Sequence, residues 1–153
     1  MVSNAFLRRN FFVDTGIWKA HLDKRDQWHG LVNAILKELA EWRTPLITTD
    51  VVILEFITLA RRDVSLGKIE EYIESILESA RVEYTIAGDL HSARKLLKTY
   101  SAIPFSGVDA SSIAVMERLE IGRALTIDDE FIRCKKFIEV RPTYPERKTV
   151  LDP

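Results

Sequence analysis

The sequence has few of the residues on which several common kinds of protein chemistry depend. A single cysteine, Cys134, excludes an internal disulfide, and we expect it to be an ordinary small side chain. The three histidines, His21, His29 and His91, are scattered at spacings that do not suit a zinc site. The six glycines form neither a phosphate-binding loop nor a G-x-G-x-x-G motif, which argues against the common nucleotide-binding folds.

Long apolar runs and excess charge are also missing. No stretch approaches the roughly 20 residues needed to span a bilayer. The basic residues near the N-terminus follow a short apolar piece, which is the wrong order for a signal peptide. We therefore expect a cytoplasmic protein with no membrane partner. The formal net charge is −1, so a nucleic acid would have to be held by a local basic surface and bound metal.

The chain does contain an alternation of short apolar runs and amphipathic segments. The apolar runs predict buried strands at residues 11–13, 46–48, 82–86, 124–127 and 137–140. Between them, apolar residues recur at steps of three and four. This spacing predicts helices at 26–42, at 51–62 with Asp50 as N-cap, after Ser65, from about Asp89 to 100, and at 108–120 with a stop at Gly122.

This alternation indicates an α/β fold: a three-layer α/β/α sandwich with a central, mostly parallel sheet of about five strands. The composition is 46% hydrophobic and 29% charged, which is ordinary for a globular domain. No linker or repeat divides the chain. We therefore predict a single domain over residues 1–153, with an irregular tail from about residue 141, where three of the five prolines stand.

Four acidic residues stand in unusual, apolar surroundings. Asp14 ends the run at 11–13, and Asp128 follows the run at 124–127. Glu55 lies inside an apolar helical segment, and Asp109 opens another. Carboxylates in such places are costly unless a cation offsets them. Their oxygens are the ligands that Mg²⁺ and Mn²⁺ prefer, so the pattern suggests metal-dependent attack on a phosphodiester.

The predicted fold lets these four acids meet. Asp14 and Asp128 come directly after strands, and sites in open parallel sheets form at the carboxyl ends of strands. Glu55 and Asp109 both lie near the beginnings of helices. Each acid also has a structural alternative, because Asp commonly caps helices and Glu55 could lie on a solvated face. Four neighbouring carboxylates without metal should repel one another, so at least one should have a raised pKa.

At these positions the chain resembles the PIN-domain ribonucleases, especially toxins of the VapC type. The likeness is carried, in order, by Phe12-Val13-Asp14-Thr15, by the segment 48–55 that ends in Glu55, by the segment 109–114, and by the segment 125–131. Together these span nearly the whole chain. The resemblance implies a PIN-like fold and a Mg²⁺- or Mn²⁺-dependent endoribonuclease that cleaves RNA phosphodiester bonds with a metal-activated water.

The resemblance also assigns roles to individual residues. The catalytic, metal-binding carboxylates are those of Asp14, Glu55, Asp109 and Asp128. Thr126 matches a hydroxyl residue two positions before the last acid, and with Thr15 it could orient a water or a carboxylate. Asp129 makes the fourth acid slightly ambiguous, although the spacing favours Asp128. Whether one or two metals bind stays open.

Three kinds of partner follow from the same resemblance: RNA, a homodimeric copy and a small antitoxin. The antitoxin tail would enter the acidic groove with a basic side chain. Apolar residues on helices could supply a dimer interface, although such stripes more often pack in a core: Trp28, Trp42, Ile69 and Ile73. Cations that could hold RNA phosphates are Arg61, Arg62, Lys68, Arg94, Lys95 and Lys98. Trp18 could stack on a base, although burial is the commoner fate of such a side chain.

Two other functions share part of this sequence pattern. A haloacid-dehalogenase-type phosphatase also uses an acid after its first strand, but it needs a second Asp where this chain has Gly16. The stronger alternative is a non-catalytic PIN-like RNA-binding or interaction module. Binding of Mn²⁺ separates this module from the nuclease and the phosphatase, because both enzymes require a metal and the module does not.

Overall fold

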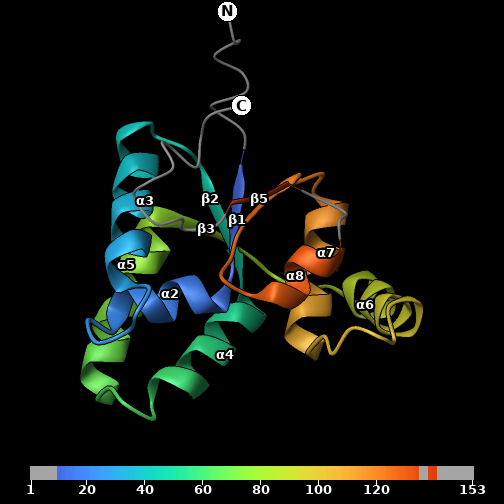
Figure 1. The fold of residues 1–153 in the computed structure, drawn as a ribbon, viewed down its shortest axis with the longest axis horizontal. Coiled ribbons are helices and arrows are strands. Elements are labelled where there is room, and N and C mark those ends of the chain that lie inside the picture. The colour runs from blue at the N-terminus through green and yellow to red at the C-terminus, as the bar shows by residue number, and fades with distance from the viewer. Residues whose placement is uncertain (1–9, 135–137, 141–153) are drawn as a thin grey trace, which may run out of the picture.

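A computed structural model describes residues 10–134 and 138–140 of the chain, with side chains up to Phe131 (Figure 1). Its strands form one parallel sheet with the order β3-β2-β1-β4-β5. The strands are β1 (Phe11–Val13), β2 (Leu46–Thr49), β3 (Ala80–Glu83), β4 (Arg123–Leu125) and β5 (Ile138–Val140). The predicted tail from residue 141 and the single-domain boundary at 153 lie outside the described residues.

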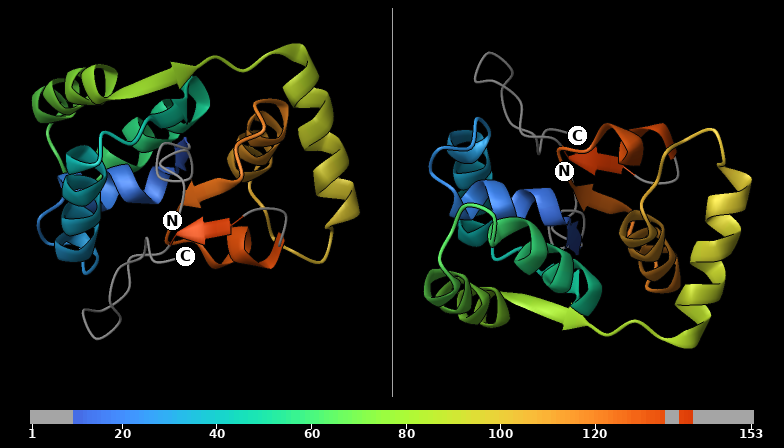
Figure 2. Two further views of the ribbon diagram at one scale, coloured as in Figure 1. Left: turned by 90° about the horizontal axis from the view of Figure 1, so that it is seen from above. Right: turned by 90° about the horizontal axis from the view of Figure 1, so that it is seen from below.

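Seven helices in the described residues cover the two faces of this sheet (Figures 1 and 2). Helices α2, α3 and α5 lie on one side, α7 and α8 lie on the other, and α6 is outermost beside α7. The predicted α/β/α sandwich is therefore confirmed. The helices are α2 (Thr15–Leu22), α3 (His29–Glu41), α4 (Asp50–Ala60), α5 (Leu66–Ser79), α6 (Ala87–Thr99), α7 (Gly107–Arg118) and α8 (Asp129–Cys134).

The central strands are apolar because helices cover both of their faces. All three residues of β1, Phe11, Phe12 and Val13, are buried, and β4 is buried throughout. Strands of a parallel sheet read as continuous apolar runs for this reason, rather than as alternating patterns. No helix among the described residues has the length and hydropathy that crossing a membrane would require.

Several predicted element ends are wrong in detail. Helix α4 is capped by Thr49, whose hydroxyl accepts a hydrogen bond from the Val52 N–H. The predicted cap, Asp50, is instead the first helical residue, and its carboxylate accepts from the Thr85 N–H. Helix α3 begins at residue 29 rather than 26, and α6 begins at residue 87, two residues before the predicted start. Side-chain caps can form from either of two neighbouring polar residues, so sequence alone places these ends within a few residues.

Two further predictions fail for reasons of backbone and packing. Helix α7 ends at Arg118, and the left-handed turn after it is made by Glu120 with φ 54° and not by Gly122. The apolar spacing after Ser65 also predicts that Leu77 faces the core, but its side chain is exposed, because α5 buries only a narrow stripe that includes Ile69 and Ile76. The short helices α2 and α8 were not predicted.

The order of the strands places a crevice beside β1. The chain moves outward from β1 through β2 to β3 and then returns to place β4 on the other side of β1. The connections therefore diverge between β1 and β4, and crevices at such reversals are where ligands bind in open α/β sheets. Residue Asp14 lies at this point, since its N–H donates to the carbonyl of Leu125 at the end of β4 (3.1 Å).

An ion-pair clamp holds the outer elements in place. Arg118, at the end of α7, donates to both carboxylate oxygens of Asp89 on α6 (2.8 and 3.0 Å) and to Glu83 on β3 (2.9 Å). Burial alone would raise the pKa of Asp89, but hydrogen bonds from Arg118 and from the Ile86 N–H outweigh it and leave this pKa below its usual value. The clamp therefore joins β3, α6 and α7, and α7 carries one of the four acids.

We predict that Arg118→Ala lowers the free energy of unfolding by about 2–3 kcal/mol, because it leaves a buried carboxylate without its cation. The Asp89 side chain is only 2% exposed, whereas that of Arg118 is 29% exposed, which moderates the loss. Urea unfolding measures the change. Arg81→Ala is the matched control, because its ion pair with Glu83 is at the surface and should contribute under about 1 kcal/mol. Equal stability of the two variants would contradict the clamp.

Candidate active site

A pocket of about 560 Å³ opens at the strand reversal, and it contains all four predicted acids. Four separate parts of the chain contribute to it: the start of α2, the middle of α4, the start of α7 with its preceding loop, and the start of α8. The lining residues are Asp14, Thr15, Gly16, Glu55, Leu59, Pro104, Ser106, Asp109, Ile127, Asp128, Asp129 and Glu130.

Asp14 lies at the centre of this arrangement. It is the N-cap of α2, and its carboxylate accepts from the Thr15 N–H (2.8 Å) and from the Thr126 hydroxyl (3.0 Å). Burial, followed by the nearby charge of Asp109, raises its pKa to about 7 despite these hydrogen bonds. The expected raised pKa is therefore confirmed, and the cap and the site acid prove to be the same residue.

Asp109 is held by a capping box at the start of α7. Its carboxylate accepts from the Ser106 N–H (2.8 Å), and its own N–H donates to the Ser106 hydroxyl (3.0 Å). Burial raises its pKa, and the charges of Asp128 and Glu55 add to the effect. Ser106 was missed in the sequence, although the spacing S-x-x-D before an apolar helix is a recognisable signal for such a box.

Glu55 reaches the pocket from α4. Its Oε2 accepts from the Thr15 hydroxyl at 2.6 Å, so α2 and α4 are joined directly at the rim. The Thr49 cap fixes where α4 begins, and this places residue 55 about one and a half turns along the helix. The hydroxyl of Thr15 thus contacts a carboxylate, although its role as an orienting group stays a prediction.

The fourth acid is fixed by a small chain of hydrogen bonds. Thr126 donates to Asp14 and accepts from the Asp128 N–H (3.0 Å), and Asp128 in turn accepts from the Glu130 N–H (2.8 Å). Asp129 and Glu130 also line the pocket, and Asp128 is the less exposed of the two adjacent aspartates. A hydrogen bond with the Asp128 side chain, aided by its charge, raises the pKa of Glu130. Glu130 was not predicted, because nothing in its spacing marks it.

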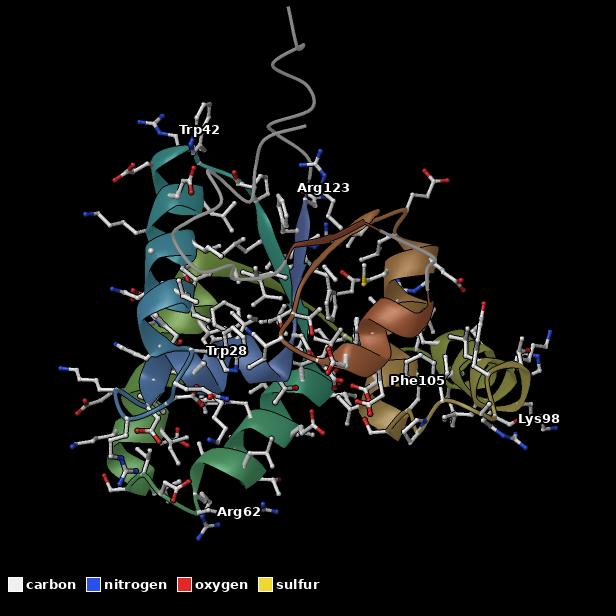
Figure 3. The ribbon with its side chains drawn as sticks, in the orientation of Figure 1. Trp28, Trp42, Arg62, Lys98, Phe105 and Arg123 are labelled. Carbon is white, nitrogen blue, oxygen red and sulfur yellow. The ribbon has the colours of Figure 1, made fainter. Side chains whose placement is uncertain are left out.

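No predicted RNA-contacting cation lies in this pocket, whose lining includes no Lys, Arg or His among the described residues. Figure 3 shows Arg62 beyond the end of α4 and Lys98 on the outlying helix α6, away from the centre of the molecule. Trp18 is buried, and its indole N–H donates to the Thr48 hydroxyl (3.2 Å). It therefore packs in the core and cannot stack on a base.

The donors around the pocket suit a hard divalent cation, although they are not gathered around one point. The acidic groups offer only carboxylate oxygens, which Mg²⁺ and Mn²⁺ prefer. Within the described residues, no three His, Cys, Asp or Glu side chains are already placed to hold one ion. Both Asp14 oxygens and one Glu55 oxygen are engaged by N–H or hydroxyl groups. Mg²⁺ commonly takes one or two carboxylates with waters and substrate phosphate, so these residues fit it.

Gly16 leaves no room for the second acid of a dehalogenase-type phosphatase. A Cβ atom there would lie 3.0 Å from Cγ1 of Ile127, which is closer than ordinary packing allows without movement. A larger acidic side chain would need more space still. The geometry therefore agrees with the sequence in disfavouring that alternative.

Comparison with known proteins gives a consistent result. The PIN domain family matches residues 11–136 of the chain. The 23S rRNA-specific endonuclease VapC20 of Mycobacterium tuberculosis is 30% identical over 133 residues, which cover 86% of this chain and 98% of that protein. The crystal structure of Mycobacterium tuberculosis VapC20, described as a sarcin-ricin loop cleaving toxin, superposes with a TM-score of 0.77 at 29% identity, covering 86% of this chain and 99% of that one.

A more distant structure shares the fold. VapBC2 from Rickettsia felis, solved with a DNA fragment from its promoter, has a TM-score of 0.64 at 14% identity, covering 86% of this chain and 98% of that one. Identity at that level supports the fold alone. The family match and the VapC20 relative confirm the resemblance seen in the sequence: this chain belongs to the PIN-domain family and is homologous to VapC20.

Proposed function

We propose that this protein is a metal-dependent endoribonuclease and the toxin of a VapC-type toxin–antitoxin pair. The observation that carries this proposal is a pocket that, among the described residues, is lined by six carboxylates and no cation. Burial and the charges of neighbouring acids raise the pKa of two of these carboxylates, Asp14 and Asp109. A site that collects negative charge in this way is built for a cationic ligand. Homology to an RNA endonuclease supports RNA as the substrate class.

The ion we propose is Mg²⁺ or Mn²⁺, held by Asp14 and Asp109 with Glu55 and Asp128 beside them. When bound, such an ion would supply positive charge at the scissile phosphate and acidify a water. The protein's own part is to orient the carboxylates. The Thr15 N–H and the Thr126 hydroxyl hold Asp14, the Ser106 N–H holds Asp109, and the Glu130 N–H holds Asp128. The number of ions stays open.

Ribosomal RNA is the first substrate to test. The related VapC20 is named for cleavage of 23S rRNA, and the similarity covers nearly the full length of that protein. The alternative function, a non-catalytic PIN-like binding module, has no observation of its own in its favour. It also leaves the collected carboxylates around the pocket without a purpose.

An antitoxin is the second proposed partner. The pocket is open and anionic, so an Arg or Lys side chain from an antitoxin tail would find several carboxylate oxygens there. Such a side chain would occupy the place of the metal and block cleavage. Addition of the antitoxin to the cleavage assay below should therefore abolish the activity.

A homodimer is the third proposed partner, and the surface that we propose for it is not the one suggested by the sequence. Of the suggested residues, Ile69 is fully buried and Trp28 and Ile73 are partly buried against the core, whereas Trp42 is 50% exposed at the end of α3. Four other apolar side chains are exposed on α4, on α6 and on the link from β3 to α6, beside an apolar pocket of about 400 Å³: Leu54, Tyr84, Ile86 and Leu90. One of them, Leu54, directly precedes Glu55 in α4.

Metal-dependent cleavage is the first prediction. Pure protein should cut 23S rRNA or a mixed single-stranded RNA pool in Mg²⁺ or Mn²⁺ and should stop when EDTA is added. Asp109→Asn should reduce the cleavage rate by about 10²-fold or more, since it removes one charge that balances the ion. Glu78→Gln, on α5, is the control and should cleave normally. If calorimetry shows Mn²⁺ binding but no RNA is cleaved, the metal site is supported and these RNAs are rejected as substrates. If Mn²⁺ does not bind, the proposed nuclease is rejected.

Asp14 should make the metal-free protein less stable at higher pH. Its folded pKa of about 7 lies above the ordinary value of 3.8, so the folded state holds an extra proton between these pH values. Stability should therefore fall as pH rises from about 4 to 7.

Asp14→Asn removes this titration and should be more stable than wild type at pH 8 by about 1–3 kcal/mol, but not at pH 4. Mn²⁺ should stabilise wild type at pH 8 and have little effect on the variant. Thermal unfolding in EDTA and in Mn²⁺ measures both effects. Asp129→Asn, at the exposed neighbour of Asp128, is the control. A variant that is less stable than wild type at pH 8 would contradict the proposed cost of ionising Asp14.

The dimer surface can be tested by adding charge to it. Leu90→Glu places a carboxylate on a side chain that is 66% exposed, so the variant should fold normally but dissociate to a monomer. Leu77→Glu is the matched control, because Leu77 is 49% exposed on α5, outside this surface. Sedimentation measures the mass. A wild-type monomer, or a Leu90→Glu dimer, would contradict the assignment.

A further inference from the structure

Helix α6 presents an unbroken basic face to solvent. His91, Arg94, Lys95 and Lys98 are all exposed, and His91 and Lys98 are each three or four residues from both Arg94 and Lys95, so the four share one face; Ala93 and Leu96 on the opposite side are buried. Within the described residues, none of these four side chains forms an ion pair. The one acid on α6 is Asp89, which is buried and neutralised by the Arg118 clamp.

Helix α5 does not share this charge. There, Lys68 stands among four glutamates, Glu70, Glu71, Glu74 and Glu78. Helix α6 lies at the opposite side of the molecule from α3 and α5 and projects beyond α7 (Figure 2). The basic face of α6 is thus an outlying surface, remote from the acidic helix α5.

The basic helix is connected closely to the acidic pocket. The six residues after Lys98 lead to Pro104, which lines the pocket, so the two Cα atoms are at most about 20 Å apart. Helix α6 also packs along α7, whose first turn carries Asp109. A polymer with one segment in the pocket therefore has α6 within reach of a neighbouring segment.

RNA needs such a second contact. A pocket of carboxylates repels phosphate, and a bound metal would neutralise charge only at the phosphate that is cleaved. Affinity for the rest of the strand has to come from cations that displace counterions from its backbone. Exposed Lys and Arg in a row along a helix fit a chain of phosphates by charge and by spacing.

The other predicted cations are placed less favourably. Arg61 and Arg62 follow Leu59, which also lines the pocket, so distance alone does not exclude them. They are, however, followed directly by Asp63. Lys68 lines a different pocket, which also contains Asp23, Asp63 and Glu71. Acids therefore lie near this group of cations, whereas the one acid on α6, Asp89, is buried.

We propose that the exposed face of α6, formed by Arg94, Lys95 and Lys98 with His91 beside them, is the anchor for the RNA backbone. The strand lies along α6 while a neighbouring phosphodiester enters the acidic pocket. This inference rests on the proposed function, and it adds the surface that binds RNA outside the site of cleavage. It also requires that RNA long enough to reach α6 binds better than RNA that fills the pocket alone.

The test compares two triple variants of the full chain that each lose three positive charges. The first is Arg94→Ala/Lys95→Ala/Lys98→Ala, and the control is Arg61→Ala/Arg62→Ala/Lys68→Ala. Each is made in wild type for cleavage and in Asp109→Asn for binding without cleavage. The probes are labelled single-stranded RNAs of mixed sequence, about 20 and about 4 nucleotides long. Fluorescence anisotropy over a range of KCl concentrations gives the affinity and its salt dependence.

For the long RNA, loss of three phosphate contacts should make the slope of log affinity against log salt shallower by about 2. The affinity should fall at least tenfold in the α6 variant, and KM should rise while kcat is kept. The control variant and the short RNA should change less than threefold. Urea unfolding should show both triple variants as stable as wild type.

An α6 variant with the wild-type salt slope and KM for the long RNA would overturn the inference, and so would an equal loss in the control variant. If α6 instead contacted an acidic protein partner, RNA binding would be unchanged, and this too would reject the proposal. Failure of the proposed function looks different: wild type would then cleave neither RNA in Mg²⁺ or Mn²⁺. Cleavage of the short RNA by wild type and by the α6 variant alike would uphold the nuclease independently of the anchor.

Discussion

Repulsion between carboxylates gathered at one end of the sheet is the constraint on which the arrangement of this molecule depends. Burial raises the pKa of both Asp14 and Asp109; the charge of Asp109 raises that of Asp14 further, and Asp128 adds to the effect on both. Without compensation, such a group would push the β1, α7 and α8 segments apart. The compensation comes from the backbone, because an N–H group at the start of each of the helices α2, α7 and α8 donates a hydrogen bond to Asp14, Asp109 and Asp128, respectively. The positive ends of the helix dipoles act in the same direction.

The same residues therefore serve the fold and the site. Asp14 caps α2, Asp109 closes a capping box with Ser106, and Asp128 accepts a hydrogen bond from the Glu130 N–H in the first turn of α8. An acidic residue at the start of a helix is usually interpreted either as an N-cap or as a site residue, but not as both. Here the hydrogen bond that begins the helix also fixes the direction in which the carboxylate faces. Thr126 also contacts two of the acids, because its one hydroxyl donates to the Asp14 carboxylate and accepts from the N–H of Asp128.

Sequence alone was enough for the layers, the parallel sheet and the carboxylates that line the pocket, because these depend on apolar runs and on acids placed directly after strands. Ser106 could have been found from its spacing to Asp109, but Glu130 could not, because its approach to Asp128 follows from the turn into α8. The exact caps also escaped, since Thr49 and Asp50 are both good N-caps and only tertiary contacts choose between them. The exposed apolar surface around Leu90 could not be predicted from the sequence. Apolar periodicity shows which residues of α6 share a face, but not how much of that face another helix covers.

The separation of charge across the molecule is the remaining consequence of the acidic pocket. A pocket lined by carboxylates repels the phosphates of a polyanion wherever no cation offsets it, so in the proposed nuclease most of the attraction for RNA comes from a different surface. Helix α6 is suited to attracting RNA because its one acid, Asp89, is paired with Arg118. The exposed side chains of Arg94, Lys95 and Lys98 therefore have no acid on their own helix to neutralise them. The clamp that secures α6 on α7 thus also determines the charge that α6 shows to solvent. The position of the basic surface relative to the pocket then follows from packing against α7, which carries Asp109, rather than from any contact between the cations and the acids.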